Sequence, residues 1–580
     1  MTQRRRKSRR VEKPGPARGQ APSSIEAVSS PDEAPPLPDP RTTALRLIAV
    51  LAIAMAVVMA FSSFVPYYAL PAATLDRVRN VQQAIVWTFG IAGGLTLVAL
   101  ALVRRLPAWV APTMAVACFI AGVGFYLPFS NDDTFIFCRY ARNLAAGHGP
   151  VYNLGDRVEG FTSPAWVALL AGIARAGGDP VAGAKVLGVL LGAAAVAGIY
   201  ACVKRLTRDA AAAMFAAAAF AVSQLFLSWA GSGMDVAIFL TWQVAFFCVV
   251  LERRRLDAAV VAVAAVGFLV RPEAYMIAGV VGAWLFAREW PAARGRAVAG
   301  AAALAAFATL PVAARWLYFH SLLPNTYYAK SYLFMRGGAD YLIDGARYLG
   351  WPWVVLGVAG LASQVRREGW LLVCAAVYGG YFLYVGRDVL SFRMLLFAVP
   401  LLMIGLGVLT STVRDLRIRR VLAIAGLGAL LVIAVRQMVS APGQLTGQRG
   451  HLYVASNSVG TFQCDYPAGL YLAQHGYPDD VLATDNIGAV SYYGGTRIQD
   501  LLGLVNLQPG VGAFRRQSAA EQLLALPPRW LLCSLVPDPA GERWVVSPFG
   551  DIRGWAEPLY APVGRWQSVN GYARVLLERR

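Results

Sequence analysis

The sequence has 580 residues, of which 57% are hydrophobic and 15% are charged, and its mean hydropathy is +0.50. Soluble globular proteins carry charge on about 25% of their residues. A water-soluble chain of several domains is therefore excluded, and most of this chain is expected to lie in lipid. The 53 basic and 33 acidic residues leave a net charge of +20. The positions of the basic residues, described below, assign this excess to membrane topology rather than to nucleic-acid binding.

Residues 1–41 form a polar segment that begins MTQRRRKSRR and continues with many Pro, Ala and Ser residues. Such a composition buries no apolar surface, so we predict a disordered tail. Its basic cluster is typical of a cytoplasmic orientation signal that also contacts anionic lipid headgroups. A cleavable signal peptide is not expected, because the first apolar run starts far from the terminus and continues too long.

Residues 42–439 are predicted to form a transmembrane domain, because long apolar runs follow one another closely. The shorter run 164–176 is predicted to be re-entrant or interfacial. The thirteen predicted spans lie near 43–61, 82–103, 107–128, 181–202, 209–229, 235–251, 257–270, 274–288, 297–318, 351–364, 369–385, 392–411 and 420–438.

The connections between the spans support this count. With the basic tail in the cytoplasm, all six inside loops are rich in Arg or Lys, as the positive-inside rule requires. A miscount of one span would reverse this bias in every later loop. We therefore predict a multi-pass protein of the bacterial inner membrane with a periplasmic C-terminal region. The inside loops contain Arg104-Arg105, Lys204-Arg205, Glu252 to Arg255, Arg288 to Arg296, Arg366-Arg367 and Arg414 to Arg420.

The outer region 440–580 is predicted to be an α/β domain of about 140 residues, because short β-rich runs such as RWLLCSL and YARVLLERR alternate with Gly and Pro. Cys464 and Cys533 are the only cysteines that share a polar region, and either a disulfide or two buried thiols would fit. No CxxC pair occurs and the four histidines are scattered, so no zinc site is predicted.

The densest polar stretch lies in the predicted outer loop 129–180, where Asp132 and Asp133 follow the third span. One aspartate, preferably Asp133, would suit a helix N-cap. At helical spacing Asp132 shares a face with Arg139 and Asn143. A carboxylate beside a low-dielectric wall is expected to have a raised pKa that suits a general base. Arg139 or Arg142 would hold a phosphate or orient that carboxylate, and either would equally serve as an anchor to lipid headgroups.

Three other outer segments carry polar residues that have both structural and functional interpretations. Glu159 precedes a tight Gly-Phe-Thr-Ser-Pro turn, and Arg271-Pro272-Glu273 would form a kinked loop with a local ion pair. Charged groups at such depths are costly and tend to line a cavity. The run LLPNTYYAK would serve as an interfacial aromatic belt or as a phosphosugar site.

Several of these motifs occur together in a known family. The run DDTFIFCRYARNLAAGHGPVYNLGDRVEGFTSPAW resembles the first outer loop of GT-C glycosyltransferases that use polyprenyl-phosphate sugars, most closely the mycobacterial terminal β-arabinofuranosyltransferase group and its bacterial relatives. LLPNTYYAK, GSGMD, RPEA, GRDVLSFRMLLFAVP and DNIGAVSYYGGTRIQDLLGL are similar to further family motifs in the same order. The resemblance covers about residues 107–510.

The sequence departs from the family pattern at three positions. Relatives often carry Glu where this chain has Asp235. They usually have a G-G-D followed by R-F, whereas here Arg387 replaces the second glycine and Met394 replaces the phenylalanine.

The resemblance implies a polytopic GT-C fold with about thirteen spans and a C-terminal periplasmic α/β domain. It also implies transfer of a monosaccharide, with arabinofuranose as the candidate, from a polyprenyl-phosphate donor to an envelope glycan, lipid or protein. Asp132 or Asp133 would be the catalytic carboxylate, and Lys330, Arg271, Arg393 and Arg139 would bind the donor phosphate. The resemblance allows a divalent metal, as in GT-C enzymes generally, but nothing in the sequence demands a cofactor. The candidates for sugar or acceptor binding are Asn143, His148, Tyr152, Glu159, Glu273, Asn325, Tyr328 and Asp388.

Two other functions remain open at this point. A secondary transporter also has many spans, but its polar residues should lie in mid-membrane, often in repeated halves. No internal repeat is visible, and the charged motifs lie in outer loops. A non-catalytic envelope-assembly protein would not need paired aspartates together with several cations. The sequence therefore favours the glycosyltransferase.

Overall fold

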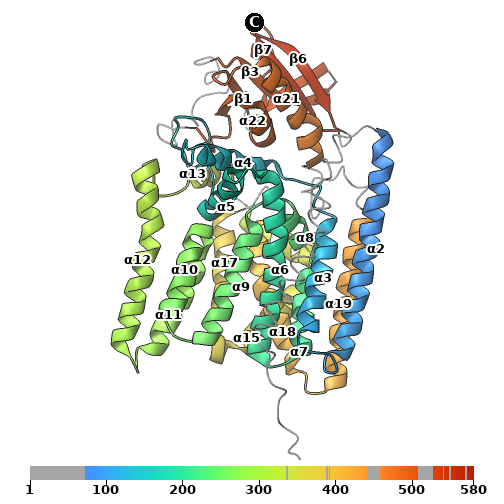
Figure 1. Cartoon of the computed structure of the whole chain (residues 1–580), viewed down its shortest axis with the longest axis vertical. Helices are drawn as coiled ribbons and strands as arrows, with labels where there is room; N and C mark the ends of the chain where they lie inside the picture. Colours follow the sequence, from blue (N-terminus) through green and yellow to red (C-terminus); the bar gives the residue numbers. More distant parts are fainter. Residues whose placement is uncertain are drawn as a thin grey trace, which may run out of the picture.

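The computed structural model describes residues 72–334, 337–386, 390, 392–440, 458–506, 527–539, 541–547, 550–568 and 571–580, with the backbone alone for 72–84, 330–334 and 439–440. A bundle of long helices stands below a small sheet domain (Figure 1). Between the two lie the short helices α4 (Asp132–Ala145), α5 (Pro164–Arg175) and α13 (Asn325–Phe334). The predicted span 43–61 and the tail 1–41 fall outside the described residues.

A helix lies at every predicted span from 82–103 onward, because each apolar run is long enough to form several helical turns. Aspartates cap several of these helices. Asp179, for example, accepts hydrogen bonds from two backbone N–H groups in the first turn of α6. The helices of the bundle are α2 (Ala72–Leu102), α3 (Val110–Gly124), α6 (Pro180–Thr207), α7 (Ala210–Ala221), α8 (Gln224–Gly231), α9 (Val236–Arg253), α10 (Ala258–Val270), α11 (Glu273–Glu289), α12 (Arg294–Phe319), α15 (Trp351–Ser363), α16 (Val365–Glu368), α17 (Trp370–Val385), α18 (Val399–Thr412) and α19 (Leu416–Ser440).

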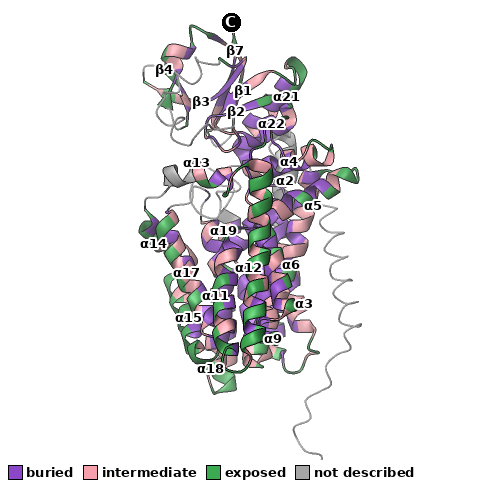
Figure 2. Ribbon diagram, turned by 90° about the vertical axis from the view of Figure 1, so that its left-hand side faces the viewer, coloured by how far each residue is buried: buried purple, intermediate pink, exposed green. Residues whose placement is uncertain are grey.

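Six of the described helices are long and apolar enough to cross a membrane, and the bent pair α7 and α8 makes a seventh if it counts as one span. Other apolar helices are shorter, and α10 and α15 have 13 residues each. The chain is therefore a multi-pass membrane protein, and the count of thirteen crossings stays a prediction. The outward-facing side of α12 is largely exposed (Figure 2), as expected for a helix that contacts lipid.

The predicted span 209–229 is bent, because the chain turns by 58° between α7 and α8. The side chain of Gln224 supports the bend. Its amide donates to the carbonyl of Ala434 at 3.1 Å and its oxygen accepts from the hydroxyl of Tyr126. A break of this kind is tolerated in a membrane protein where polar groups find partners inside the bundle.

Several short helices lie at the end of the bundle that faces the sheet domain (Figures 1 and 2). The predicted interfacial run 164–176 is a helix, with Pro164 in its first turn. These helices and the loops between them carry the polar motifs of the sequence. They are α4 (Asp132–Ala145), α5 (Pro164–Arg175), α13 (Asn325–Phe334) and α14 (Gly338–Leu349).

The C-terminal domain contains a seven-stranded mixed sheet, which agrees with the predicted fold class. Strand β1 pairs in parallel with β2 and β3, and the other pairs are antiparallel. The short helix α22 follows β1 and faces α4. The elements are η5 (Thr461–Asp465), α21 (Tyr466–His475), β1 (Val481–Thr484), α22 (Gly488–Gly494), β2 (Arg497–Asp500), β3 (Trp530–Asp538), β4 (Gly541–Val546), β5 (Gly550–Asp551), α24 (Arg553–Ala556), β6 (Tyr560–Gln567) and β7 (Ala573–Arg579).

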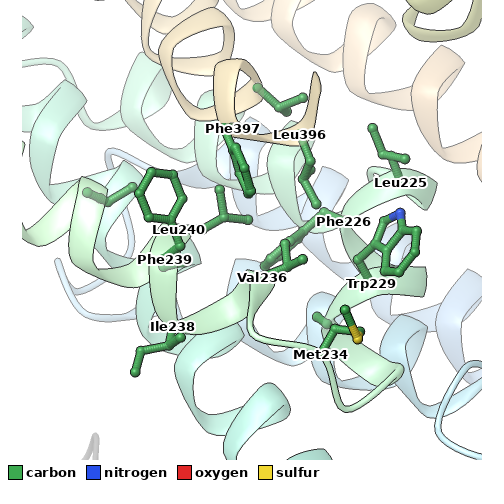
Figure 3. Packing of buried hydrophobic residues seen from close by; sticks show 14 of the residues in the cluster. Leu225, Phe226, Trp229, Met234, Val236, Ile238, Phe239, Leu240, Leu396 and Phe397 are labelled. Atoms are coloured by element: carbon green, nitrogen blue, oxygen red, sulfur yellow. The ribbon is translucent and has the colours of Figure 1, made fainter. Parts of the chain in front are cut away.

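A continuous apolar core joins the bundle to the short helices. Side chains of α8, α9 and the short helix η2 (Met394–Ala398) meet inside it (Figure 3). Phe239 packs edge-to-face on Phe397, with 4.6 Å between ring centroids. This packing gives the polar residues around η2 a rigid support.

Candidate active site

A cavity of about 200 Å³ lies where the bundle, the short helices and the sheet domain meet. One part of its wall is apolar, and another part carries two arginines and three acidic residues. The sheet domain contributes Leu504. The wall is formed by Asp133, Ile136, Phe137, Gly160, Phe161, Thr162, Met234, Asp235, Arg271, Pro272, Glu273, Leu323, Pro324, Thr326, Tyr327, Tyr381, Phe382, Val385, Gly386, Arg393, Met394 and Leu504.

Asp133 is the second residue of α4, and it lines the cavity. The helix is capped by Asn131, whose side chain accepts from the backbone N–H of Asp133 at 3.0 Å. The predicted N-cap role of Asp133 is therefore wrong. One carboxylate oxygen of Asp133 lies 3.8 Å from a guanidinium nitrogen of Arg393. Arg393 is buried and also lies over the ring of Trp229.

Asp132, one residue earlier, faces the sheet domain. Its carboxylate accepts hydrogen bonds from the backbone N–H groups of Gly488 (2.7 Å) and Ala489 (2.8 Å), at the start of α22. Burial, helped by the nearby charge of Asp465, raises the pKa of Asp132 to about 7. Successive helical residues point about 100° apart, so the two aspartates serve different partners.

Arg271, at the junction of α10 and α11, is held between two acids. It forms an ion pair with Asp235 and contacts both oxygens of Glu273 at 3.0 and 3.1 Å. All three side chains are buried and line the cavity. The Arg271 guanidinium lies over the ring of Phe397, 4.9 Å from its centroid. Two carboxylates around one guanidinium give this group a net negative charge. This charge does not favour the predicted role of Arg271 as a phosphate-binding cation.

Glu159 and Asn325 brace the edge of the cavity. The Glu159 carboxylate forms a two-point ion pair with Arg315 of α12. The backbone carbonyl of Glu159 accepts from the backbone N–H of Asn325 at 2.9 Å. The amide of Asn325 donates to the carbonyls of Gly503 (2.8 Å) and Leu504 (2.9 Å) in the sheet domain. Both predicted residues thus hold the walls together, while the residues after each of them line the cavity.

Three further predicted residues hold the outer loop in place. Arg139 donates to the carbonyls of Tyr152 (3.0 Å), Ser491 (2.7 Å) and Thr496 (2.8 Å). Asn143 donates to the carbonyl of Tyr152. The Tyr152 hydroxyl donates, over 2.7 Å, to the carbonyl that precedes α22. None of the three lines the cavity, and the Arg139 guanidinium is occupied by the sheet domain rather than turned toward a phosphate site.

The remaining predicted residues do not add to the described wall. His148 is exposed in the loop after α4. Tyr328 is half-buried on α13 and packs edge-to-face on Tyr327, which does line the cavity. The side chain of Lys330 and the whole of Asp388 fall outside the described residues, so their predicted roles stay predictions.

Several cavity residues were not among the predicted site residues. Asp235 was noted only for its place in the GSGMD motif. Thr326 and Tyr327 lie in LLPNTYYAK beside the predicted residues Asn325 and Tyr328. The sequence alone does not show which residues of this run face the cavity. Leu504 comes from a loop far along the chain, and no local pattern connects it with α4.

Metal and disulfide chemistry find no support in the described part of the chain. Within it, no three His, Cys, Asp or Glu side chains are grouped so that they could hold a metal ion. Cys464 and Cys533 are both buried free thiols, which decides between the two alternatives left open by the sequence.

Several known proteins are similar to parts of this chain. A family profile described as "Domain of unknown function (DUF8728)" matches residues 457–576, which correspond to the sheet domain. A terminal beta-(1->2)-arabinofuranosyltransferase of Mycobacterium tuberculosis is 44% identical over 66 residues, which is 11% of this chain and 10% of that protein. The protein of the same name from Corynebacterium glutamicum is 26% identical over 364 residues. That match covers 52% of each chain. This chain therefore aligns with about half of the Corynebacterium protein and about a tenth of the Mycobacterium protein.

A solved structure matches nearly the whole fold. ArnT from Cupriavidus metallidurans, bound to undecaprenyl phosphate, aligns over 81% of this chain and 98% of its own, with a TM-score of 0.50 and 15% identity. This chain has the GT-C fold. At 15% identity the likeness is one of fold, and it confirms the predicted class of a helical membrane protein with a small C-terminal sheet domain. The two sequence matches confirm the resemblance to terminal arabinofuranosyltransferases.

Proposed function

We propose that this chain is a membrane glycosyltransferase that moves one sugar from a polyprenyl-phosphate donor to a hydroxyl group of an envelope glycan, lipid or protein. The observation that carries the proposal is the pair of Asp133 and Arg393, 3.8 Å apart on the cavity wall. The undecaprenyl phosphate bound to ArnT supports a lipid-phosphate donor. The names of the sequence relatives support arabinofuranose as the sugar.

The chemistry needs one base and one cation. Asp133 accepts the proton of the acceptor hydroxyl, whose oxygen attacks the anomeric carbon of the donor. The bond between that carbon and the phosphate oxygen breaks, and its electron pair leaves with the phosphate. Arg393 stabilises the developing phosphate charge. The products are the glycosylated acceptor and the polyprenyl phosphate, and the proton stays on Asp133.

The size and lining of the cavity suit this donor. The cavity, at about 200 Å³, is smaller than the pockets of about 300–1,000 Å³ that enclose a drug-sized ligand. It would therefore hold the sugar-phosphate end of the donor and leave the lipid chain outside. Apolar residues such as Phe137, Phe382 and Val385 form part of the wall and would contact the first isoprene units. The rest of the chain would lie along the bundle in the bilayer.

The catalytic assignment is tested with Asp133→Asn in detergent-purified protein and a radiolabelled polyprenyl-phosphate arabinofuranose donor. The amide keeps the shape of the side chain but cannot accept a proton at neutral pH. We expect the rate of transfer to fall by about 10²–10⁴-fold, the usual contribution of a general base. Thermal stability should change little, because Asp133 is partly exposed and its ion pair with Arg393 is long.

Asp340→Asn is the matched control, because Asp340 is exposed on α14 and does not line the cavity. It should retain wild-type turnover. Wild-type turnover in Asp133→Asn would contradict the assignment of the base to Asp133. If Asp132→Asn then lost turnover while keeping its fold, the base would be Asp132 instead.

A further inference from the structure

Two buried oxygen atoms in the cavity wall have no hydrogen-bond partner among the described residues. They are Oδ1 of Asp235 and Oγ1 of Thr326. Asp235 is fully buried and Thr326 is 6% exposed. Both residues line the cavity that Asp133 and Arg393 share.

Such atoms need an explanation, because the large majority of buried polar side-chain atoms in proteins have a hydrogen-bond partner, and leaving one without a partner destabilises the fold. The fold gives no reason for either atom. Asp235 already pairs with Arg271 through its other oxygen, so Oδ1 adds nothing to that ion pair. A valine at position 326 would fill the same space as threonine without a hydroxyl group. Both polar atoms are therefore poised to bind something that enters the cavity.

The charge distribution of the wall indicates which part of a ligand each side accepts. On one side of the wall Arg393 faces Asp133, so this side carries one base and one acid. The group of Asp235, Arg271 and Glu273 carries two acids and one base. An anion would be repelled by this acidic group, whereas a neutral hydroxyl can donate a hydrogen bond to a carboxylate oxygen.

We propose that Asp235 and Thr326 bind hydroxyl groups of the donor's sugar, while Arg393 binds its phosphate. This inference rests on the proposed function and adds the residues that select the glycosyl group. Oδ1 of Asp235 accepts from one hydroxyl, and the Thr326 hydroxyl donates to or accepts from another. Arg271 is then a positioning residue, because it fixes the Asp235 carboxylate through Oδ2.

The test compares two ligands that differ only in the sugar, farnesyl-phosphate arabinofuranose and farnesyl phosphate. In Thr326→Val, we expect the Kd for the sugar-bearing ligand to rise about tenfold, which corresponds to loss of one hydrogen bond of about 1.4 kcal/mol. The Kd for farnesyl phosphate should stay within about twofold of wild type. Thr326→Ser should restore most of the lost affinity. Because Oγ1 has no partner in the wall, the valine variant should fold at least as well as wild type.

Two further variants complete the design. Asp235→Asn should weaken the sugar-bearing ligand selectively, and Thr309→Val, on the exposed side of α12, should change neither Kd. The inference would be overturned if Thr326→Val bound both ligands with the wild-type Kd. It would also be overturned if the variant lost affinity for both ligands by the same factor. If wild-type protein bound neither ligand, the proposed function itself would fail. If wild type bound both and transferred the sugar while Thr326→Val behaved identically, only the inference would fail.

Discussion

The two aspartates at the start of α4 show how neighbouring residues of one type take different tasks. Asp132 accepts two backbone N–H groups of the sheet domain, and Asp133 lines the cavity. The 100° step between successive helical residues separates them, and the cap from Asn131 fixes where the helix begins. A sequence pattern locates such a pair, but it does not say which carboxylate faces the substrate.

Arg393 provides the prediction at the residue scale. Arg393→Gln should raise the Kd for farnesyl phosphate by about 10–100-fold, because hydrogen bonds to charged groups contribute about 1.5–3 kcal/mol. Arg393→Lys should recover part of this loss, since an ammonium keeps the charge but not the two-point geometry of a guanidinium. Titration of detergent-purified protein gives the Kd. The control is Arg255→Gln, which changes an exposed arginine of a predicted inside loop. An unchanged Kd in Arg393→Gln would remove Arg393 from the phosphate site.

At the scale of elements, the contact between α22 and α4 joins the sheet domain to the bundle. A Cβ atom on Gly488 would lie 2.0 Å from the backbone oxygen of Asp132, so only glycine fits this approach. The same domain brings Leu504 to the cavity wall and receives the amide of Asn325. Docking of α22 therefore shapes one side of the cavity.

Gly488→Ala should separate α22 from α4 and lower both transfer activity and thermal stability. We expect faster hydrogen exchange over residues 481–500 and a loss of unfolding free energy of about 1–3 kcal/mol, the usual cost of overpacking. Gly554→Ala in α24 is the matched control, because nothing lies within 4 Å of its Cβ position. Wild-type exchange and activity in Gly488→Ala would show that this contact is not required.

The elements differ in how far the sequence predicts them. Each described apolar run is a helix near its predicted bounds, since a segment in lipid must satisfy its backbone internally. The bend between α7 and α8 was not predicted, because no proline or glycine marks it. Its stability depends on Tyr126 and Ala434, which reach Gln224 from other helices.

For the whole molecule, buried carboxyl groups make stability depend on pH. Burial raises the pKa of Asp132 to about 7 and that of Asp500 to about 6, from an ordinary value of 3.8. Each group then binds its proton more tightly in the folded state, so its stabilising contribution is complete below about pH 4 and is lost as the pH rises to 6–7. The pKa of Asp480 is instead lowered, so its carboxylate stabilises the folded state at higher pH. That contribution is lost only as the pH falls below about 4.

We therefore expect the Tm of the purified protein to fall between pH 5 and pH 7.5. Asp132→Asn should flatten this dependence, because the amide cannot lose a proton, while Asp340→Asn should leave the slope as in wild type. Thermal unfolding in detergent at a series of pH values measures the effect. A Tm that rises steadily over this interval would contradict the assignment.

The proposed orientation of the whole molecule places the sheet domain outside, because six predicted inside loops are basic. Cysteines introduced at Asp340 and Asp479, both exposed, should react with an impermeant maleimide added to intact cells. A cysteine at Arg255 should react only after permeabilisation. Wild-type protein sets the background, since six of its seven cysteines are buried. Labelling in the reverse pattern would invert the topology.

The sequence by itself determined the membrane class, the helical runs, the small sheet domain and the motifs from which the site is drawn. Those features follow from local composition, because apolar length and residue periodicity act over neighbouring residues. Only the tertiary structure decided that Asp133 faces the cavity, that Arg139 and Tyr152 hold the sheet domain, and that Asp235 and Thr326 join the wall. These assignments depend on which helix faces meet across hundreds of residues, and packing in three dimensions sets that geometry.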